Sequence, residues 1–251
     1  MFDAALELAE NPNTYVPLAA GDERIVTERY VLWMGRGDEP HWNVAQRFRF
    51  EPQELDEARV EIHDALRMRG RTACTWEVGS SASPDDLVER LLELGLLEEE
   101  GSSAVGMVLE EPIPSSRPDG IEVRRSRGEG DEIVAAEIAA IAFGGSVSPR
   151  AFHPDSPVVT YLAYLDGEPV GRATASFSEY GVSLFGGAVL PAARGRGAYR
   201  ALVVARHADA AARGRPLAVT QGGPMSRPIL ARLGFREVCE IRTLLDAFDR
   251  D

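Results

Sequence analysis

The stretch with the clearest chemical character is AVLPAARGRGAYR, residues 188–200. A strand-like run ends at Pro191, and the Arg-Gly-Arg-Gly run at 194–197 then leads directly into an Ala-rich, helix-like segment. Glycine lets the backbone approach a ligand closely, and the first N–H groups of a helix have no partner within it. With two arginines and the helix dipole added, this arrangement predicts an anion site, most naturally for a diphosphate. Without its context the same run would be a surface turn with solvated arginines.

Other chemistries are excluded or disfavoured by residue type. The loop lacks the Lys and Ser/Thr of a GxxxxGK[ST] nucleotide loop, and its spacing is not GxGxxG. All 27 basic residues are Arg, so covalent lysine chemistry is excluded. Cys74 and Cys239 stand far apart without metal-ligand spacing, so we expect buried thiols and no metal site.

Composition and charge limit the class of protein and its partners. The chain has 251 residues, of which 44% are apolar and 27% charged, as in globular proteins. No apolar run approaches the roughly 20 residues of a membrane span, and the first ten residues, MFDAALELAE, are acidic rather than basic. We therefore expect a cytoplasmic protein without a membrane partner. The net charge of −13 also argues against a nucleic-acid partner.

The charge excess divides the chain in two. Residues 1–118 hold 24 Asp and Glu against 11 Arg, whereas residues 119–251 hold 16 of each. Between them the segment EEPIPSSRPDG, at 110–120, has the composition of a linker. We therefore expect two domains, residues 1–118 and residues 119–251.

Hydrophobic periodicity predicts an α/β layer pattern in both halves. In the first half we expect strands at 25–34 and 44–50, a helix at 52–68, a strand at 72–78, a helix that Ser83 caps and Pro84 begins, and a strand within 96–109. In the second half we first expect a strand at 121–125, a helix at 131–143 and a hairpin of 158–165 and 170–177 around Asp166-Gly167. A strand at 182–190 and a helix ending near Arg213 should follow. The half should end with a strand at 216–220, a helix at 224–233 and a closing strand at 235–245. The two halves end in the same order of elements, which suggests an internal structural duplication.

The loop and its setting resemble the GNAT family of acyl-CoA N-acyltransferases over about residues 121–246. The family motif R/Q-x-x-G-x-G/A follows a strand that ends in Val-x-Pro; here Val189-Leu190-Pro191 precedes RGRGAY at 194–199, which departs from the motif only at Tyr199. The segment QGGPMSRPILARLGF at 221–235 also fits the family's order of elements. The resemblance implies tandem GNAT-like folds, each a mixed, mostly antiparallel sheet flanked by helices. The first half, which lacks the glycine–arginine loop, would be a degenerate copy.

The resemblance also implies how acetyl-CoA, as co-substrate, would bind. In the family the strand before the motif splays from its neighbour, and its backbone pairs with pantetheine. The implied pantetheine residues here are Ala188, Val189 and Leu190. The loop amides hold the pyrophosphate, and the implied residues are Arg194, Gly195, Arg196, Gly197, Ala198 and Tyr199.

Catalytic groups are less clearly marked. The family often has a Tyr before its Leu-Gly-Phe ending that protonates the leaving thiolate, but the aligned residue here is Leu230. Ser226 is a candidate acid, and the alternative is an ordinary serine at the N-terminus of a helix, without a catalytic role. For the base, Glu179 and Tyr180 lie nearest in sequence to the central strand, although turn residues are commonly just exposed.

Two histidines are weighed because imidazole titrates near neutral pH. His207 lies mid-helix, where we expect it on the solvated face. His153 lies in the weakly patterned segment 144–157, which could cover an acceptor site as a lid.

Two hypotheses follow for the function. The first is an N-acetyltransferase in which a primary amine, of a small molecule or a protein, attacks acetyl-CoA directly while a strand N–H polarises the thioester carbonyl. The second is a non-catalytic acyl-CoA-binding or interaction module, suggested by the missing Tyr and strand carboxylate. Monomer and homodimer remain equally open.

Overall fold

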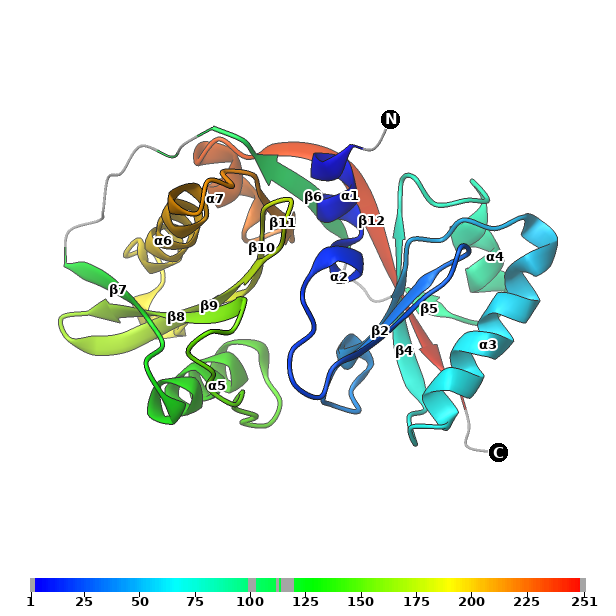
Figure 1. Cartoon of the computed structure of the whole chain (residues 1–251), viewed down its shortest axis with the longest axis horizontal. Helices are drawn as coiled ribbons and strands as arrows, with labels where there is room; N and C mark the ends of the chain where they lie inside the picture. Colours follow the sequence, from blue (N-terminus) through cyan, green and yellow to red (C-terminus); the bar gives the residue numbers. More distant parts are fainter. Residues whose placement is uncertain (1–2, 99–102, 112, 114–119, 249–251) are drawn as a thin grey trace. The chain divides into compact units, whose positions relative to one another are not determined.

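The computed structural model describes residues 3–98, 103–111, 113 and 120–248, and the chain forms two compact units (Figure 1). Unit 1 comprises Met1–Gly106, Gly222–Arg227 and Glu237–Asp251, and unit 2 comprises Met107–Gln221 and Pro228–Arg236. The predicted boundary at 118/119, and most of the linker predicted at 110–120, lie outside the described residues.

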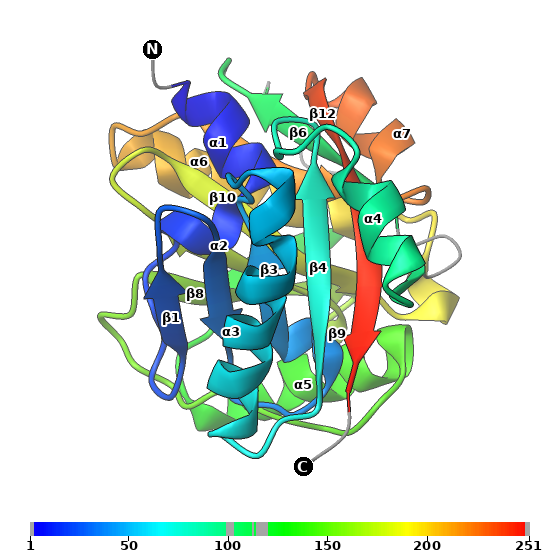
Figure 2. The same cartoon turned by 90° about the vertical axis from the view of Figure 1, so that its right-hand side faces the viewer.

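Unit 1 is a sheet covered by helices. Its elements are α1 (Ala4–Glu10), α2 (Pro12–Tyr15), β1 (Glu23–Val26), β2 (Val31–Met34), η1 (Pro40–Trp42), β3 (Asn43–Gln46), η2 (Pro52–Glu54), α3 (Leu55–Arg67), β4 (Ala73–Gly79), α4 (Leu87–Glu93), β5 (Leu97–Glu98) and β12 (Arg236–Ala247), with the start of β6 (Ala104–Leu109). The strand order is β1-β2-β3-β4-β12, in which only the β3–β4 pair is parallel. Figure 2 shows α3 and α4 in front of this sheet.

Three predicted boundaries in unit 1 are wrong. The single strand predicted at 25–34 is two, because the Thr27 hydroxyl accepts hydrogen bonds from the Arg29 and Tyr30 N–H groups and closes a turn. The strand predicted to reach residue 50 ends at Gln46, since Arg47 has a φ of 57°. Ser83 does not cap the next helix, which begins at Leu87; its hydroxyl donates instead to the Phe50 carbonyl.

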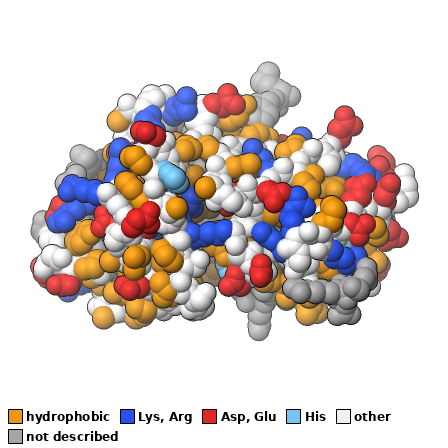
Figure 3. Space-filling model, turned by 60° about the horizontal axis from the view of Figure 1, so that its bottom comes forward, with side chains coloured by type: hydrophobic (Ala, Val, Ile, Leu, Met, Phe, Trp, Pro, Cys, Tyr) orange, Lys and Arg blue, Asp and Glu red, His pale blue; other side chains and the backbone are white. Residues whose placement is uncertain are grey.

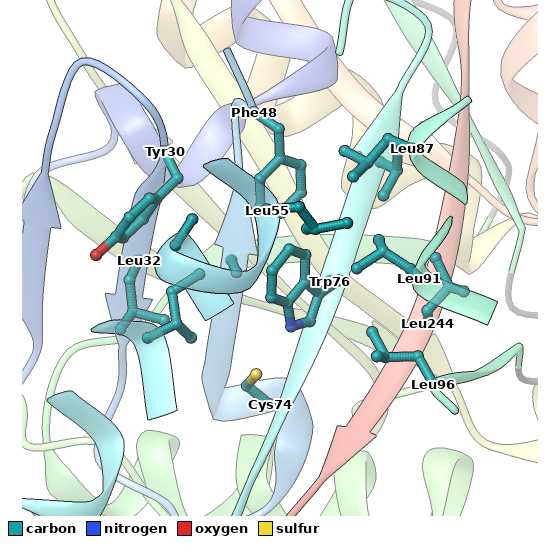
Figure 4. Packing of buried hydrophobic residues seen from close by; sticks show 14 of the residues in the cluster. Tyr30, Leu32, Phe48, Leu55, Cys74, Trp76, Leu87, Leu91, Leu96 and Leu244 are labelled. Carbon is teal, nitrogen blue, oxygen red and sulfur yellow. The ribbon is translucent and has the colours of Figure 1, made fainter. Parts of the chain in front are cut away.

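Trp76 is the centre of the unit 1 core. Its fully buried indole stacks on Phe48, with ring centroids 4.8 Å apart and planes 12° from parallel. Figure 4 shows leucines of α3, α4 and β12 around this pair, with Cys74 beside the indole. Burial of several aromatic and aliphatic side chains around one ring gives unit 1 its own hydrophobic core.

Unit 2 is a second layered sheet. Its elements are β7 (Ile121–Arg125), α5 (Glu129–Phe143), β8 (Val158–Leu165), β9 (Glu168–Phe177), β10 (Val182–Val189), η3 (Pro191–Ala193), α6 (Ala198–Ala212), β11 (Ala218–Gly222) and α7 (Arg227–Arg232), with the last part of β6. The order is β6-β11-β10-β9-β8-β7, with β7 to β10 antiparallel and β10–β11 parallel. The predicted layered α/β fold with a mixed, mostly antiparallel sheet is confirmed.

The two long helices of unit 2 cover opposite faces of its sheet (Figure 1). Adjacent residues of β8 point to opposite faces: Thr160 Oγ1 donates to Glu132 of α5, at 2.9 Å, and the Tyr161 hydroxyl donates to Asp209 of α6. The predicted hairpin turn at Asp166-Gly167 is confirmed, with φ values of 54° and 89°. The sequence patterns that predicted the two long helices and the hairpin of unit 2 therefore placed these elements correctly.

The last strand of each half is exchanged between the units. The strand predicted at 235–245 to close the second half is β12, which pairs antiparallel with β4 of unit 1 from Ile241↔Gly79 to Ala247↔Ala73. Met107–Leu109 of β6 belongs to unit 2, whose strand order places β6 beside β11. Periodicity identifies a strand but not its neighbour, so the sequence did not reveal the exchange.

The outer face of α5 carries apolar side chains that the core does not use. Ile133, Ile141 and Phe143 are exposed, and Figure 3 shows hydrophobic side chains gathered over this part of the molecule. None of the helices in the described ranges has both the length and the apolar character that a membrane span needs.

Candidate functional site

The candidate site begins where β10 and β11 part. Their parallel pairing comprises only Val182↔Ala218 and Ser183↔Val219, after which β10 continues to Val189. The Thr220 hydroxyl still reaches the Leu184 carbonyl, at 2.9 Å. Beyond this point β10 and β11 have no further residues in register, which agrees with the parting of strands that the resemblance implies.

A β-bulge interrupts β10 just past the parting. The register with β9 runs regularly to Phe185↔Thr174 and resumes at Ala188↔Arg172, so Gly186 and Gly187 together lie opposite the single residue Ala173 of β9. Gly186 has a φ of +53° and is exposed. A non-glycine residue rarely adopts that conformation, which explains the glycine at position 186.

The turn after β10 has the backbone that an anion site needs. Pro191–Ala193 forms one 3₁₀ turn, and Gly195 and Gly197 have φ values of +76° and +91°. Gly197 is the N-cap of the 15-residue helix α6 and has no side chain with which to cap it. A Cβ on Gly195 would meet no heavy atom within 4 Å, so the space around the turn is open. The first turn of α6 can therefore receive an anion from outside.

Arg194 and Arg196 add positive charge at this turn. Both are exposed, and neither forms an ion pair with any residue that the structure describes. Arg194 Nε donates to the Val189 carbonyl, at 3.3 Å, so this side chain folds back over the end of β10. Two guanidinium groups not neutralised by carboxylates suit a diphosphate better than a neutral ligand.

The residues implied for the pantetheine arm differ in what they can offer. Leu190 uses its N–H for the Val170 carbonyl and its own carbonyl for the Ala193 N–H, so only its side chain can line a ligand. Ala188 is buried in the cluster beneath α5. The Val189 carbonyl is the group that Arg194 covers.

Tyr199, the departure from the motif, turns back toward the strand. Its ring edge lies 2.7 Å from where a Cβ on Gly187 would stand, so ring and bulge are in contact. The Tyr199 ring therefore does not occupy the space outside the turn at Gly195. Ala198, at the start of α6, is buried.

Two arginines that sequence reasoning missed hold the bulge. Arg206 of α6 is 1% exposed; its Nη1 donates to the carbonyls of Thr174, at 3.0 Å, and Phe185, at 3.4 Å. Arg172 of β9 donates from Nη1 to the Gly186 carbonyl, at 2.7 Å. Burial lowers the pKa of Arg206 to about 10, which leaves it protonated at neutral pH. Arg206 is one of two arginines in the Ala-rich helix α6, and nothing in the sequence marks it as the buried one.

The predicted catalytic residues are spread apart. Ser226 precedes α7, and its hydroxyl donates to the Gly223 carbonyl, at 3.3 Å. Glu179 and Tyr180 are exposed in the β9–β10 turn, and Glu179 raises the pKa of Tyr180. Tyr180 precedes Gly186 by six residues, about 20 Å along an extended chain. Leu230 is a buried core residue without a proton to give.

A buried carboxylate lies on the α5 face of the sheet. Glu132 is 6% exposed and accepts the Thr160 hydroxyl. Thr160 pairs with Thr174, which pairs with Phe185 beside the bulge. This alignment could not be predicted from the sequence, because it depends on the register of three strands.

Of the histidines and cysteines considered in the sequence, His207, Cys74 and Cys239 are buried and His153 is exposed. The prediction that His207 lies on the solvated face is wrong: it is 2% exposed and its Nε2 lies 2.8 Å from the Pro216 carbonyl. His153 is exposed, and its role in a lid stays a prediction. Cys74 and Cys239 are buried thiols, as expected, and burial raises both pKa values.

In unit 1 the chain also passes from a strand through a turn into a helix, but hydrogen bonds close the place that corresponds to the turn of unit 2. After β3 the chain stays joined to the segment following β4, through Ser83 N–H to the Phe48 carbonyl, at 3.1 Å, and Phe50 N–H to the Ser83 carbonyl, at 3.4 Å. The buried Glu10 carboxylate accepts the N–H and hydroxyl of Ser81 there. Acidic residues then begin α3 and would repel a phosphate.

Several solved structures that share this architecture are GCN5-related N-acetyltransferases or tandem GNAT proteins. A GCN5-related N-acetyltransferase from Kribbella flavida matches with a TM-score of 0.75 and 20% identity, covering 98% of this chain and 96% of that one. One from Sphaerobacter thermophilus matches with a TM-score of 0.62 and 19% identity, covering 89% and 82%. A tandem GNAT protein from the clavulanic acid biosynthesis pathway matches with a TM-score of 0.57 and 14% identity, covering 97% and 94%. The chain therefore has the GNAT fold, and its similarity to a tandem protein extends over both units.

Comparison of the sequence itself finds no such relative. No protein-family model matches the chain, and no curated protein matches it.

Proposed function

We propose that this protein is an N-acetyltransferase that transfers the acetyl group of acetyl-CoA to a primary amine by direct attack. The observation that carries the proposal is the opening of β10 from β11 directly before a glycine–arginine turn into α6. The GNAT fold supports the same reading. The pyrophosphate would lie at Gly195, Gly197 and the first turn of α6, with Arg194 and Arg196 beside it.

The reaction needs few protein groups. The amine nitrogen attacks the thioester carbonyl carbon, the N–C bond forms, the C–S bond breaks, and the proton lost by nitrogen ends on the CoA sulfur. The chain's contribution is to place the two reactants together and to offer a backbone N–H of the β10 bulge to the carbonyl oxygen. Glu132, which accepts the Thr160 hydroxyl on the α5 face of the sheet, is our candidate to receive the amine proton.

A second candidate is an acyl-CoA-binding module without turnover. The specific observation in its favour is Leu230, which is buried where the family's acid would stand. Ser226 would have to leave the Gly223 carbonyl to act in its place.

Release of free thiol from acetyl-CoA separates the two candidates. The protein is incubated with acetyl-CoA and a panel of primary amines, and thiol is followed with a chromogenic reagent. The two buried cysteines of the chain give a low background. We expect release that saturates with one class of amine. Saturable acetyl-CoA binding without release across the panel would favour the module, and no binding would refute both.

The partners and setting follow from the same proposal. The acceptor is a small-molecule amine or a protein amine, and nucleic acid and membranes are not partners. The cytoplasmic location and the division into domains at residues 1–118 and 119–251 stay predictions.

A further inference from the structure

The carbonyl groups of the β10 bulge are held by arginine side chains from two neighbouring elements. Arg206 reaches the Phe185 carbonyl from α6, and Arg172 reaches the Gly186 carbonyl from β9. The two residues thus contact consecutive peptide groups at the one irregular place in the β9–β10 register past the parting from β11.

Arg206 is unusual for a buried charge. It has no ion pair with a carboxylate among residues 3–98, 103–111, 113 and 120–248, and it donates hydrogen bonds to the carbonyls of Thr174, Phe185 and Leu202. Burying a guanidinium costs free energy unless strong acceptors surround it. Stability alone would be served as well by an apolar residue, since the neighbouring strands could pair without it.

Holding these carbonyls fixes where the next amides point. The only cis peptide in the described chain is Ser83–Pro84, so the bulge peptides are trans. In a trans peptide the C=O and the following N–H point in opposite directions. A Gly186 carbonyl turned toward Arg172 therefore turns the Gly187 N–H away from Arg172. Gly187 lies in the bulge opposite Ala173 of β9, past the point where the β10–β11 pairing ends at Ser183.

We propose that Arg172 and Arg206 are positioning residues, which hold the bulge so that the Gly187 N–H receives the thioester carbonyl oxygen of the acyl donor. This inference rests on the proposed function. The contact of the Tyr199 ring with Gly187 limits movement of the bulge on the α6 side. The arginines do not touch the donor, so they set the direction of a hydrogen bond that a substrate carbonyl completes.

Binding of two unreactive donor analogues tests the proposal without knowledge of the acceptor. S-acetonyl-CoA keeps a carbonyl group near the thioester position, and S-ethyl-CoA has none. Their dissociation constants are measured by calorimetry for the wild type, Arg172→Met and Arg206→Met. We expect the wild type to prefer S-acetonyl-CoA by about tenfold, the worth of one hydrogen bond to an oriented donor. The variants should lose most of this preference while binding S-ethyl-CoA within about twofold of wild type.

Arg215→Met is the matched control. Arg215 Nη1 also donates to a backbone carbonyl of unit 2, that of Ser178, but at the far end of β10. It should keep the wild-type preference. If Arg206→Met does not fold, Arg172→Met alone decides, because Arg172 is only partly buried.

Kinetics give the second readout once an acceptor amine is known. Both variants should lower kcat by about tenfold to a hundredfold with KM for acetyl-CoA within about twofold. An unchanged analogue preference or an unchanged kcat in Arg172→Met would overturn the positioning role. If the wild type binds neither analogue, the proposed function itself fails.

Discussion

Arg194 and Arg196 are the residues on which donor affinity should depend most. Both are exposed, and neither forms an ion pair with a carboxylate among the residues that the structure describes. Replacing both with Ala should weaken CoA binding by about thirtyfold, or about 2 kcal/mol for two charge-assisted contacts. Dephospho-CoA should lose the same factor if the pair contacts the pyrophosphate. Calorimetric titration of each ligand decides this, and unchanged affinities would remove both arginines from the site.

At this scale the sequence predicted some residues and missed others for a physical reason. The turn at 194–197 could be predicted because glycine and arginine limit both conformation and chemistry. Arg206, Arg172 and Glu132 could not, since their importance arises from β9–β10 pairing and from helix packing. Arginine and glutamate are usually exposed, so nothing in the pattern suggested burial.

Among the elements, β12 has the most specific anchor. Asp246 is 1% exposed and accepts from Arg59 Nη2, at 2.9 Å, while His63 Nε2 lies 2.7 Å from its other oxygen. Burial alone would raise the pKa of Asp246, but the hydrogen bonds from His63 and Arg59 outweigh it, so that pKa is lowered. The sequence patterns placed most helices and strands correctly. They could not reveal this anchor, because Asp246 lies 187 positions after Arg59 and 183 positions after His63.

Asp246→Ala should destabilise the protein by about 3 kcal/mol at neutral pH, because it leaves the Arg59 charge without its partner. A carboxylate with a lowered folded-state pKa stabilises above its unfolded pKa, near 3.9, and loses that effect as the pH falls through the folded value. The difference between wild type and variant should therefore shrink below about pH 4. Urea unfolding of both proteins across this range measures it. Asp64→Ala, at an exposed pair with Arg67, is the control and should change stability by less than about 0.5 kcal/mol. A constant difference at all pH values would contradict the assignment.

The two units repeat one fold, and within the described residues the strand-to-helix turn is open in unit 2 and closed in unit 1. Unit 1 joins its strands across the place where unit 2 parts them, and Glu10 and Ser81 fill the position. The sequence predicted the duplication and the missing loop, but the closure depends on contacts between α1 and the segment after β4.

We therefore expect one CoA molecule per chain. Native mass spectrometry with excess CoA should show a single adduct, which the double Ala replacement of Arg194 and Arg196 weakens. A second adduct of similar affinity would mean that unit 1 also binds the donor.

The structure of the protein crystallised with CoA tests the central claim most directly. We predict the pyrophosphate at the first turn of α6 and the pantetheine arm along the edge of β10 that β11 leaves open. CoA bound elsewhere, or an empty α6 turn at saturating CoA, would contradict it.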